Sequence, residues 1–214
     1  MMEPSEGYAV PGVEVGVGPH PQPWPSDDRL DPALLAEGDR RNVADRYRYW
    51  RLDAIVADLD QRRHPFHVAI ENWQHDFNIG SIVRTANAFL AAEVHIVGRR
   101  RWNRRGAMVT DRYQHIRHHS SLAELAGWAQ EAGVPTFGID NLPGSVPLES
   151  ARLPRSCMLL FGQEGPGLSD AARGLCGSTL SIAHFGSTRS INASAAAAIA
   201  MHAWVRSHAT PCAD

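Results

Sequence analysis

An almost unbroken apolar run at residues 156–161 is the feature that most constrains the fold of this chain. A strand with apolar side chains on both faces must be covered on both sides, which is the usual situation inside a parallel sheet flanked by helices. The run is followed directly by a glycine-rich turn, GQEGPG, at residues 162–167. The sequence therefore predicts a buried strand that ends in a turn made largely of backbone.

Strand-like and helix-like patterns alternate through most of the chain. Short apolar or β-branched runs predict further strands at about 66–71, 93–98, 134–140 and 179–183, and the chain allows a short one at 114–117. Helical spacing of apolar residues predicts helices at 79–90, 122–132 and about 169–174, and an alanine-rich closing helix within 186–206. The alternation predicts an α/β fold, with an open, largely parallel sheet and helices on both faces. Ligands of such sheets bind beyond the C-terminal ends of strands.

The N-terminal part has a different character. A length of 214 residues favours one domain plus an extension. Residues 1–41 are rich in proline and glycine and are expected to form a flexible arm. Apolar residues at three- and four-residue steps predict an amphipathic helix over 42–62, within a helical extension at 42–63. The main domain is then expected at 64–208, followed by a tail at 209–214.

Composition argues against membrane and disulfide-rich classes. Hydrophobic residues make up 43% of the chain and charged residues 21%, and no apolar run approaches the roughly 18 residues that cross a bilayer. Cys157, Cys176 and Cys212 are widely spaced and form no CxxC pair. The N-terminus has no pattern of a secretory signal. We expect a cytoplasmic protein with no membrane partner.

The distribution of charge is more informative than its total. The net charge of −2 gives no argument for a nucleic-acid partner, but residues 99–105 read RRRWNRR. Arginines around an aromatic side chain suit phosphates and stacked bases. The alternative is a solvated loop whose charge is balanced elsewhere. The candidate RNA-binding residues of this region are Arg99, Arg100, Arg101, Trp102, Arg104, Arg105 and Arg112.

Two further polar turns precede predicted helices. NIGSIVR, at residues 78–84, places Asn78 at the expected N-cap of one helix, and Ser190 and Asn192 stand before the closing helix. Simple helix capping is one interpretation of Asn78 and Ser190. The other is that these two turns and GQEGPG together form one composite site. GQEGPG itself matches neither a dinucleotide-binding fingerprint nor a P-loop.

The order and spacing of the three turns resemble a known family. N-x-G-x-x-x-R-T-A, L-x-F-G-x-E-x-x-G-L and G-x-x-R-S-I-N-x-S-A-A-A-A follow one another between Phe66 and Arg206. They resemble the three motifs of the SpoU (TrmH-like) branch of the SPOUT RNA methyltransferases. Departures from the usual pattern are Ala183 and His184 in place of Pro-Met, and Ile191 in place of leucine.

The resemblance implies a fold, an activity and a cofactor. Members of the family transfer a methyl group from S-adenosylmethionine to a ribose 2′-hydroxyl of tRNA or rRNA. They act as homodimers, and their C-terminal part forms a deep trefoil knot that holds the cofactor. The layout of this chain is closer to the tRNA-modifying members, and no metal is expected. The flat surface of Ala195–Ala198 suggests that the closing helices pack at the dimer interface.

The resemblance also assigns residues, carried over by position. The cofactor-binding residues are Asp140, Leu160, Phe161, Gly162, Gly165, Ile182, Ile191 and Asn192. The catalytic residues are Arg84, Asn78, Glu164, Ser190 and Asn192. A guanidinium hardly gives up its proton, so our hypothesis is that Arg84 binds the adjacent phosphate and stabilises the developing alkoxide. Arg84 is therefore also a candidate RNA-binding residue, and Glu164 is expected to support the loops.

Two other functions remain open at this stage. His115, His118 and His119 form an HxxHH pattern, and His64, His67 and His75 lie near the first strand, which allows a metal hydrolase. Successive strand residues point to opposite faces, so a strand would separate His118 from His119. The second alternative is a non-catalytic RNA-binding module that keeps the same fold.

Overall fold

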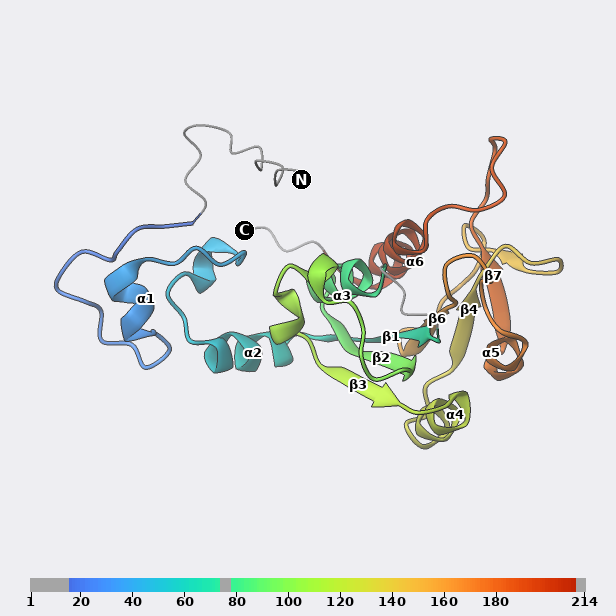
Figure 1. The fold of residues 1–214 in the computed structure, drawn as a ribbon, viewed down its shortest axis with the longest axis horizontal. Helices are drawn as coiled ribbons and strands as arrows, with labels where there is room; N and C mark the ends of the chain where they lie inside the picture. The colour runs from blue at the N-terminus through green and yellow to red at the C-terminus, as the bar shows by residue number, and fades with distance from the viewer. Residues whose placement is uncertain (1–15, 74–77, 211–214) are drawn as a thin grey trace, which may run out of the picture. The chain divides into compact units, whose positions relative to one another are not determined.

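The computed structural model describes residues 16–73 and 78–210 (Figure 1). The chain forms two compact units, residues 1–55 and 56–214, and each is described by itself. Three parts of the predictions lie outside the described residues: the first 15 residues of the arm, His75, and the last four residues with Cys212.

The first unit contains regular structure where a flexible arm was expected. Helix α1 spans Pro32–Glu37 and buries Leu35. Asp31 caps this helix, because its carboxylate accepts a hydrogen bond from the Ala33 N–H at 2.9 Å. Proline at the first helical position supports the same start, since its missing N–H would be unpaired there anyway. The proline-rich segment thus folds locally from residue 16 onward.

A buried carboxylate, Asp39, organises the rest of this unit. It accepts hydrogen bonds from the Arg41 guanidinium at 2.7 Å and from the Tyr49 N–H at 3.0 Å. Burial alone would raise the pKa of Asp39, but the hydrogen bonds from Arg41 and Tyr49 outweigh that effect and lower the pKa to about 2. Asp39 is therefore charged at neutral pH, and its hydrogen bond to the Tyr49 N–H links two parts of the unit that are ten residues apart in sequence.

The predicted helix over 42–62 is wrong in its first half. The structure has a short 3-10 helix, η1, at Asp45–Tyr47 and an α-helix, α2, only at Leu52–Asp60. Tyr49 adopts a φ of 64°, which no residue inside a right-handed helix can have. Its N–H bonds to Asp39 instead of a helical carbonyl, so a long-range contact overrides the apolar spacing.

The second unit is built on a seven-stranded sheet in the order β3-β2-β1-β6-β4-β7-β5. All of its strand pairs are parallel, which confirms the predicted α/β class and the largely parallel sheet. Strand β5 was not predicted, and it is only two residues long. The strands are β1 (His64–Asn72), β2 (Ala91–Gly98), β3 (Ile116–His119), β4 (Thr136–Ile139), β5 (Val146–Pro147), β6 (Cys157–Phe161) and β7 (Ser178–Ser181).

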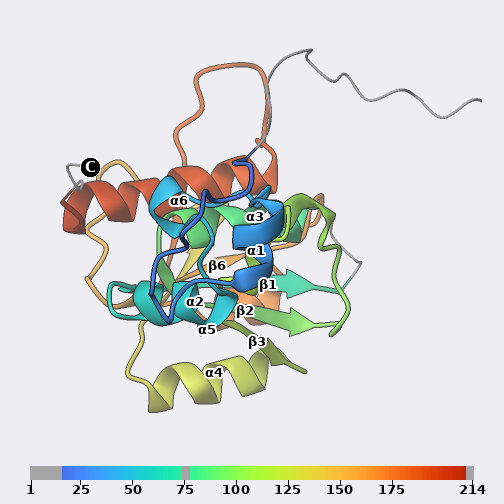
Figure 2. The ribbon, with the colours of Figure 1, turned by 90° about the vertical axis from the view of Figure 1, so that its left-hand side faces the viewer.

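Helices cover both faces of this sheet, as Figures 1 and 2 show. Helices α3 (Asn78–Ala88) and α6 (Ala193–His208) pack on one face, and α4 (Leu122–Glu131) and α5 (Asp170–Leu175) pack on the other. Strand β6 is buried along its whole length. Leu159 and Phe161 belong to the α3/α6 core, whereas Met158 and Leu160 belong to the α4/α5 core. The prediction of a strand covered on both faces is confirmed.

Two 3-10 helices, η2 (Arg105–Ala107) and η3 (Thr110–Arg112), follow the arginine-rich stretch. None of the helices in residues 16–73 and 78–210 combines the length and the apolar character that crossing a bilayer requires. The trefoil knot that the family resemblance implies stays a prediction.

Trp204 closes the α3/α6 core from the end of α6. Its ring is fully buried and lies 4.5 Å, centroid to centroid, from the ring of Phe66 on β1. Its indole N–H donates to the backbone carbonyls of Pro154 at 3.2 Å and Arg155 at 3.1 Å. The side chain therefore holds α6 to the segment that leads into β6.

We predict that Trp204→Ala lowers the free energy of unfolding by about 3–5 kcal/mol, because it leaves a large cavity and two carbonyls without their donor. Chemical denaturation followed by circular dichroism measures this loss. Phe185→Ala is the matched control, since that ring is 98% exposed, and it should stay within about 0.5 kcal/mol of the parent. A loss below about 1 kcal/mol for Trp204→Ala would contradict the described core.

Candidate active site

A cavity of about 380 Å³ lies at the carboxyl ends of β4, β6 and β7. Its walls are residues 139–142 after β4, residues 161–167 after β6, and residues 190–193 at the start of α6. Ile182 and His184 after β7 and Ala196 of α6 complete the lining. The position agrees with the rule that open parallel sheets bind ligands beyond the carboxyl ends of their strands.

Asp140 and Asn141 tie the first loop to the other two. The Asp140 carboxylate accepts the Leu168 N–H at 2.9 Å, which joins the loop after β4 to the loop after β6. The Asn141 side-chain oxygen accepts the Ile182 N–H at 3.1 Å, which joins it to the segment after β7. The Asn141 amide also lies 3.0 Å from Nδ1 of His184. Side chains from one loop thus fix the backbone of the other two.

The glycines of GQEGPG are needed because the turn folds back on itself. Gln163 and Gly167 exchange both of their backbone hydrogen bonds, at 3.1 and 3.0 Å. A Cβ at Gly162 would lie 2.0 Å from the carbonyl carbon of Gly167, which no side chain permits. A Cβ at Gly167 would lie 2.4 Å from the Asp140 carboxylate, and Gly167 has a positive φ of 72°. The turn therefore presents mostly backbone to the cavity.

A chain of three polar side chains connects the three predicted turns. The Asn78 amide donates to Glu164 Oε2 at 2.7 Å, and the Asn192 amide donates to Asn78 Oδ1 at 2.9 Å. Asn192 is also the N-cap of α6, since its oxygen accepts the Ser194 N–H at 2.9 Å. Asn192 therefore caps and bridges at once, and the composite site expected from the sequence has a physical link.

The family model of SpoU rRNA methylases matches residues 65–202, which is more than half of the chain. The chain belongs to the SpoU rRNA methylase family. The matched region begins inside β1 and ends inside α6, so it contains all of the sheet except His64 and every loop that lines the cavity.

Relatives of this SpoU family member include proteins of mycobacteria. A Mycobacterium bovis BCG protein named an uncharacterized tRNA/rRNA methyltransferase is 31% identical over 191 residues, which cover 86% of this chain and 58% of the relative. A Mycobacterium tuberculosis H37Rv protein with the same description is 30% identical over the same shares. The chain spans less than two thirds of the length of these relatives.

Solved structures of the SpoU and TrmH groups share the fold. The SpoU methyltransferase AviRb from Streptomyces viridochromogenes, solved with AdoMet, superposes with a TM-score of 0.60 at 28% identity, over 70% of this chain and 60% of AviRb. The A. aeolicus TrmH/SpoU tRNA modifying enzyme gives a TM-score of 0.64 at 19% identity, over 73% of this chain and 81% of that chain. At that identity the second likeness shows the fold alone.

Most of the residues that the sequence assigned to cofactor binding line the cavity. The lining includes Asp140, Phe161, Gly162, Gly165, Ile182, Ile191 and Asn192. Leu160 does not line it, because its side chain points into the core under α4 and α5. Phe161 and Leu160 are neighbours in sequence and therefore face opposite sides of the sheet. The assignment of Leu160 to cofactor binding, which the family pattern makes mainly through backbone groups, stays a prediction.

The catalytic candidates divide into two groups. Glu164, Ser190 and Asn192 line the cavity. Asn78 is outside the lining but forms hydrogen bonds with Glu164 and Asn192. Asn78 is the first residue of α3 rather than the predicted N-cap. Arg84 is exposed on α3 and is not part of the cavity lining. Six residues of helix correspond to a rise of about 9 Å, so Asn78 and Arg84 are about 9 Å apart along the helix axis.

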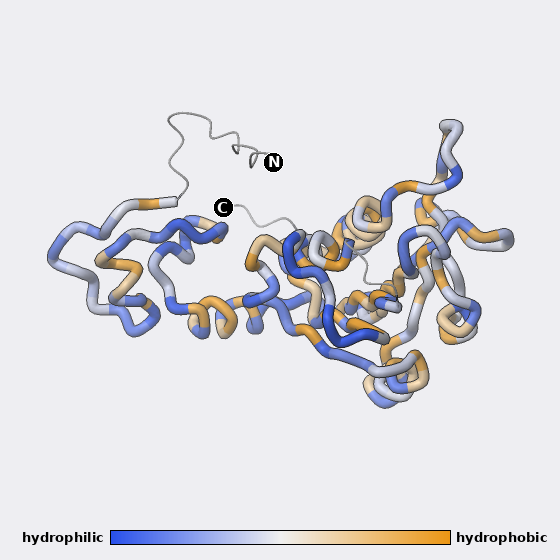
Figure 3. Tube along the Cα trace, in the orientation of Figure 1, coloured by the Kyte–Doolittle hydropathy of each residue, from blue (hydrophilic) through white to orange (hydrophobic). Residues whose placement is uncertain are grey.

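The arginine-rich loop packs against the start of α3. A Cβ on Gly80 would lie 2.7 Å from the Ala107 N and 2.9 Å from the Asn103 carbonyl, so the two backbones nearly touch. The Asn72 amide fixes the loop by donating to the Arg99 and Arg101 carbonyls at 2.8 and 2.9 Å. Figure 3 shows this stretch after β2 as strongly hydrophilic. The loop therefore packs against the N-terminal part of the helix that carries Arg84.

Within the loop the arginines and the tryptophan have different environments. The exposed residues are Arg99, Arg100, Arg101, Arg104, Arg105 and Arg112. Trp102 is 9% exposed and belongs to the α3/α6 core, with Arg104 stacked over its ring at 5.3 Å. The structure therefore leaves the arginines, and not Trp102, for contact with a ligand.

Sequence reasoning missed several residues of the cavity. Asn141 directly follows the assigned residue Asp140, and His184 comes two residues after the assigned Ile182. Ala196 lines the cavity from α6. A signal was present for Asn141, since it follows a predicted strand directly. Ala196 gave none, because only the rotation of α6 decides which alanine faces the cavity.

Proposed function

We propose that this SpoU family member transfers a methyl group from S-adenosylmethionine to a ribose 2′-hydroxyl of an RNA, with tRNA favoured over rRNA. The observation that carries the proposal is the hydrogen-bonded chain Glu164–Asn78–Asn192, which joins all three motifs beside a cavity lined by backbone-rich turns. Such an arrangement provides fixed polar groups beside apolar surface, which is the usual character of a cofactor site.

The cavity suits the proposed cofactor. Its volume of about 380 Å³ falls in the usual range for small-molecule pockets. Phe161, Ile182 and Ile191 offer apolar surface for a purine, and the turn of residues 162–167 offers backbone hydrogen-bonding groups. The cofactor would supply a methyl group on a positively charged sulfur. AviRb, a structural relative at 28% identity, was solved with AdoMet.

The ribose hydroxyl and the RNA class rest on the family and on its relatives. The mycobacterial relatives are named tRNA/rRNA methyltransferases. A further structural relative, at 25% identity and a TM-score of 0.57, is described in terms of 2-OH methylation of C/U34 on tRNA, and this chain covers 95% of it. This likeness, which covers 67% of this chain, supports tRNA as the preferred substrate.

Arg84 would act on the RNA side of the reaction. In the transfer, the bond between the ribose oxygen and the methyl carbon forms as the bond from carbon to sulfur breaks, and the hydroxyl proton passes to phosphate or water. A guanidinium keeps its own proton but can donate two parallel hydrogen bonds to a phosphate. Among the described residues the Arg84 guanidinium has no hydrogen bond or ion pair, so it is available for the phosphate next to the reacting ribose.

We predict that Arg84→Ala lowers methyl transfer by about 10²–10³-fold, the usual cost of losing one donor that acts in the transition state. The measurement is transfer of labelled methyl from S-adenosylmethionine to unmodified tRNA and, separately, to unmodified rRNA. Methylated dinucleotides that survive alkaline hydrolysis identify the ribose oxygen as the acceptor. Arg173→Ala, an exposed arginine on α5 outside the cavity, is the control and should retain full activity.

The outcomes separate the alternatives. Arg84→Lys with nearly full activity would contradict a bidentate role for Arg84. Cofactor binding without methylation of either RNA would favour a substrate in an assembled particle. Absence of cofactor binding would favour the non-catalytic RNA-binding module and would end the enzyme proposal.

The exposed arginines after β2 are proposed to bind the RNA backbone. The loop that carries them packs against the start of α3, the helix of Arg84, and Arg99, Arg100 and Arg101 have no ion pair among the described residues. Charges that are not balanced within the protein are free to replace counterions on an RNA backbone.

We predict that the double variant Arg100→Ala/Arg101→Ala makes RNA affinity less sensitive to salt. The slope of log affinity against log salt should become shallower by roughly 1–2, since each lost phosphate contact removes about 0.7–0.9. The binding of labelled tRNA at several salt concentrations measures the slope. Arg152→Ala/Arg155→Ala is the control, because these exposed arginines precede β6 at the end of the strand opposite the cavity. An unchanged slope would remove the loop from the RNA interface.

A homodimer is proposed through the outer face of α6. Ile199 is 42% exposed there and lines a groove of about 520 Å³ with Phe89, Leu148 and His202. Ala196, at the centre of the flat alanine surface, instead lines the cavity, and Ala197 is buried in the core of its own subunit. The part of α6 that is available to contact a second copy therefore begins at Ala198 and includes Ile199.

We predict that Ile199→Arg converts the dimer to a monomer, because it places a charge in an apolar contact. Light scattering after size exclusion should show the mass fall by half. Ala123→Arg on the exposed side of α4 adds the same charge on another helix and should leave the mass unchanged. A dimer that survives Ile199→Arg would place the interface elsewhere.

A further inference from the structure

Three histidines lie in a row across neighbouring strands on the α4 side of the sheet. Nδ1 of His67 on β1 is 3.0 Å from Nε2 of His95 on β2, and Nδ1 of His95 is 2.9 Å from Nε2 of His119 on β3. His95 and His119 are buried. None of these residues lines the cavity, so the row belongs to a different part of the molecule.

The row accounts for only one histidine of the HxxHH pattern. His115 instead contacts the Asp60 carboxylate at 2.8 Å, and His118 contacts the Gly98 carbonyl at 2.8 Å. As expected from strand alternation, His118 and His119 point to opposite faces of β3. The metal hydrolase interpretation of HxxHH therefore has no geometric support within the described residues.

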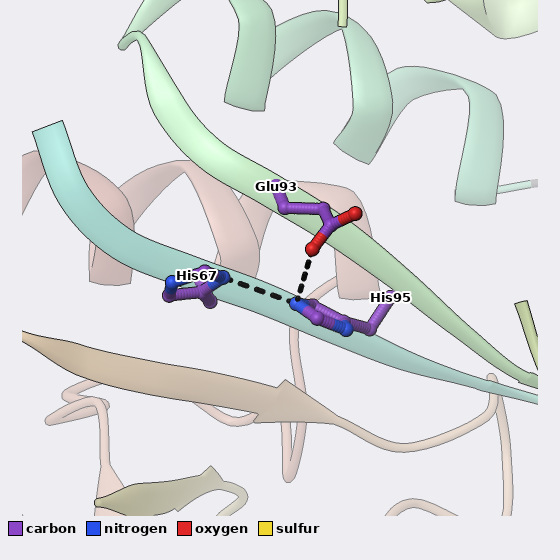
Figure 4. Close-up of side chains that lie close together, drawn as sticks. All are labelled: His67, Glu93 and His95. Atoms are coloured by element: carbon purple, nitrogen blue, oxygen red, sulfur yellow. Dashed lines mark hydrogen bonds and ion pairs between the residues drawn. The ribbon is translucent and has the colours of Figure 1, made fainter. Parts of the chain in front are cut away.

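A carboxylate joins one end of the row. Glu93 is the register partner of His67 and stands two residues before His95, so parallel pairing puts all three side chains on one face. Glu93 Oε2 lies 3.7 Å from His95 Nε2. Figure 4 shows the three side chains converging from β1 and β2. The nearest nitrogen or oxygen atoms of the three all lie within 4.8 Å of one another.

The distances are close to those of a transition-metal site. Zinc binds imidazole nitrogen at about 2.0–2.1 Å with tetrahedral angles, so two nitrogens on one ion lie about 3.3 Å apart. His67 Nδ1 and His95 Nε2 need to separate by only a few tenths of an ångström. Two histidines and one glutamate are also a usual ligand set for zinc, which leaves a fourth position for water.

The surrounding residues are those that orient metal ligands. A ligating imidazole normally donates its other N–H to an acceptor, and His119 Nε2 stands opposite Nδ1 of His95 at 2.9 Å. The Arg117 guanidinium donates to both Glu93 oxygens at 3.1 Å and fixes the carboxylate. Trp128 of α4 covers the pair, with its ring centroid 4.2 Å from that of His95 and 4.9 Å from that of His67.

Access from solvent and local charge are the remaining conditions for binding an ion. The Glu93 side chain is 17% exposed, which gives an ion a path from solvent. The Arg117 charge opposes a cation, so binding depends on Glu93 for compensation.

We propose that His67, His95 and Glu93 bind one zinc ion, which cross-links β1 and β2 on the face of the sheet away from α3 and α6. His119, Arg117 and Trp128 position the ligands and do not bind the ion. The site shares no residue with the cavity, so the ion holds the two strands together and takes no part in chemistry at the cavity. The proposal is independent of the proposed methyl transfer.

The test uses the full-length protein without a histidine tag, freed of metal by a chelator. Titration with Co²⁺ gives a visible absorption band for tetrahedral nitrogen and oxygen ligands, and Zn²⁺ then displaces it. We expect one ion per chain, and a melting temperature that rises with Zn²⁺. His67→Ala and Glu93→Gln should each weaken Co²⁺ binding by more than 10-fold and abolish the thermal shift. Circular dichroism of the metal-free variants confirms that they fold.

Two further variants sharpen the result. His119→Gln should weaken binding by about 10–100-fold while the tetrahedral band remains, as expected for a residue that only orients a ligand. His115→Ala is the matched control, since this histidine is 47% exposed and outside the cluster, and it should bind Co²⁺ as the parent does. No stoichiometric binding by the parent, or binding that survives both His67→Ala and Glu93→Gln, would overturn the proposal and leave a hydrogen-bonded row of histidines.

Discussion

The burial of β6 on both faces, at the centre of a parallel sheet, is the constraint on which the rest of the main unit depends. Because β6 pairs with β1 and β4, its carboxyl end emerges in the middle of one edge, beside the end of β4. Strand β7 follows next to β4 in the same direction. Parallel pairing therefore brings three loops to one edge, although long stretches of sequence separate them.

Adjacent loops make a site only if something holds their backbones still. Here Asp140 and Asn141 accept backbone N–H groups from the other two loops, and Gly162 and Gly167 allow the central turn to fold back on itself. Asn78 and Asn192 then link the helices on the α3/α6 face to that turn through Glu164. These hydrogen bonds fix the positions of the loops relative to one another, and they involve only a few side chains.

This also explains how much the sequence could predict. Strand β6 and its turn were predictable because burial and glycine content are local signals, and seven of the eight cofactor-binding residues assigned by the family pattern do line the cavity. The Leu160 side chain lies outside the cavity lining, because a motif gives positions along the chain, whereas the sheet decides which way a strand residue faces. The prediction of a continuous helix failed at Tyr49, because the carboxylate of Asp39, ten residues earlier, accepts the Tyr49 N–H in place of a helical carbonyl. The histidine row depends on the register between β1, β2 and β3, which no local pattern contains.

The direction of the hydrogen bonds in that row follows from its buried end. His119 Nδ1 has no hydrogen-bond partner among the described residues and lies 3.9 Å from the Glu124 carboxylate, so electrostatics favours an N–H at that atom. His119 Nε2 then accepts, Nδ1 of His95 donates, and Nε2 of His95 is left with a lone pair that faces His67 and the Glu93 carboxylate. A lone pair and a carboxylate oxygen facing each other require positive charge between them. The His67 N–H supplies part of it, and a bound cation supplies it in full, since both imidazoles then present lone pairs to the same point. The buried end of the row therefore orients its open end for a metal.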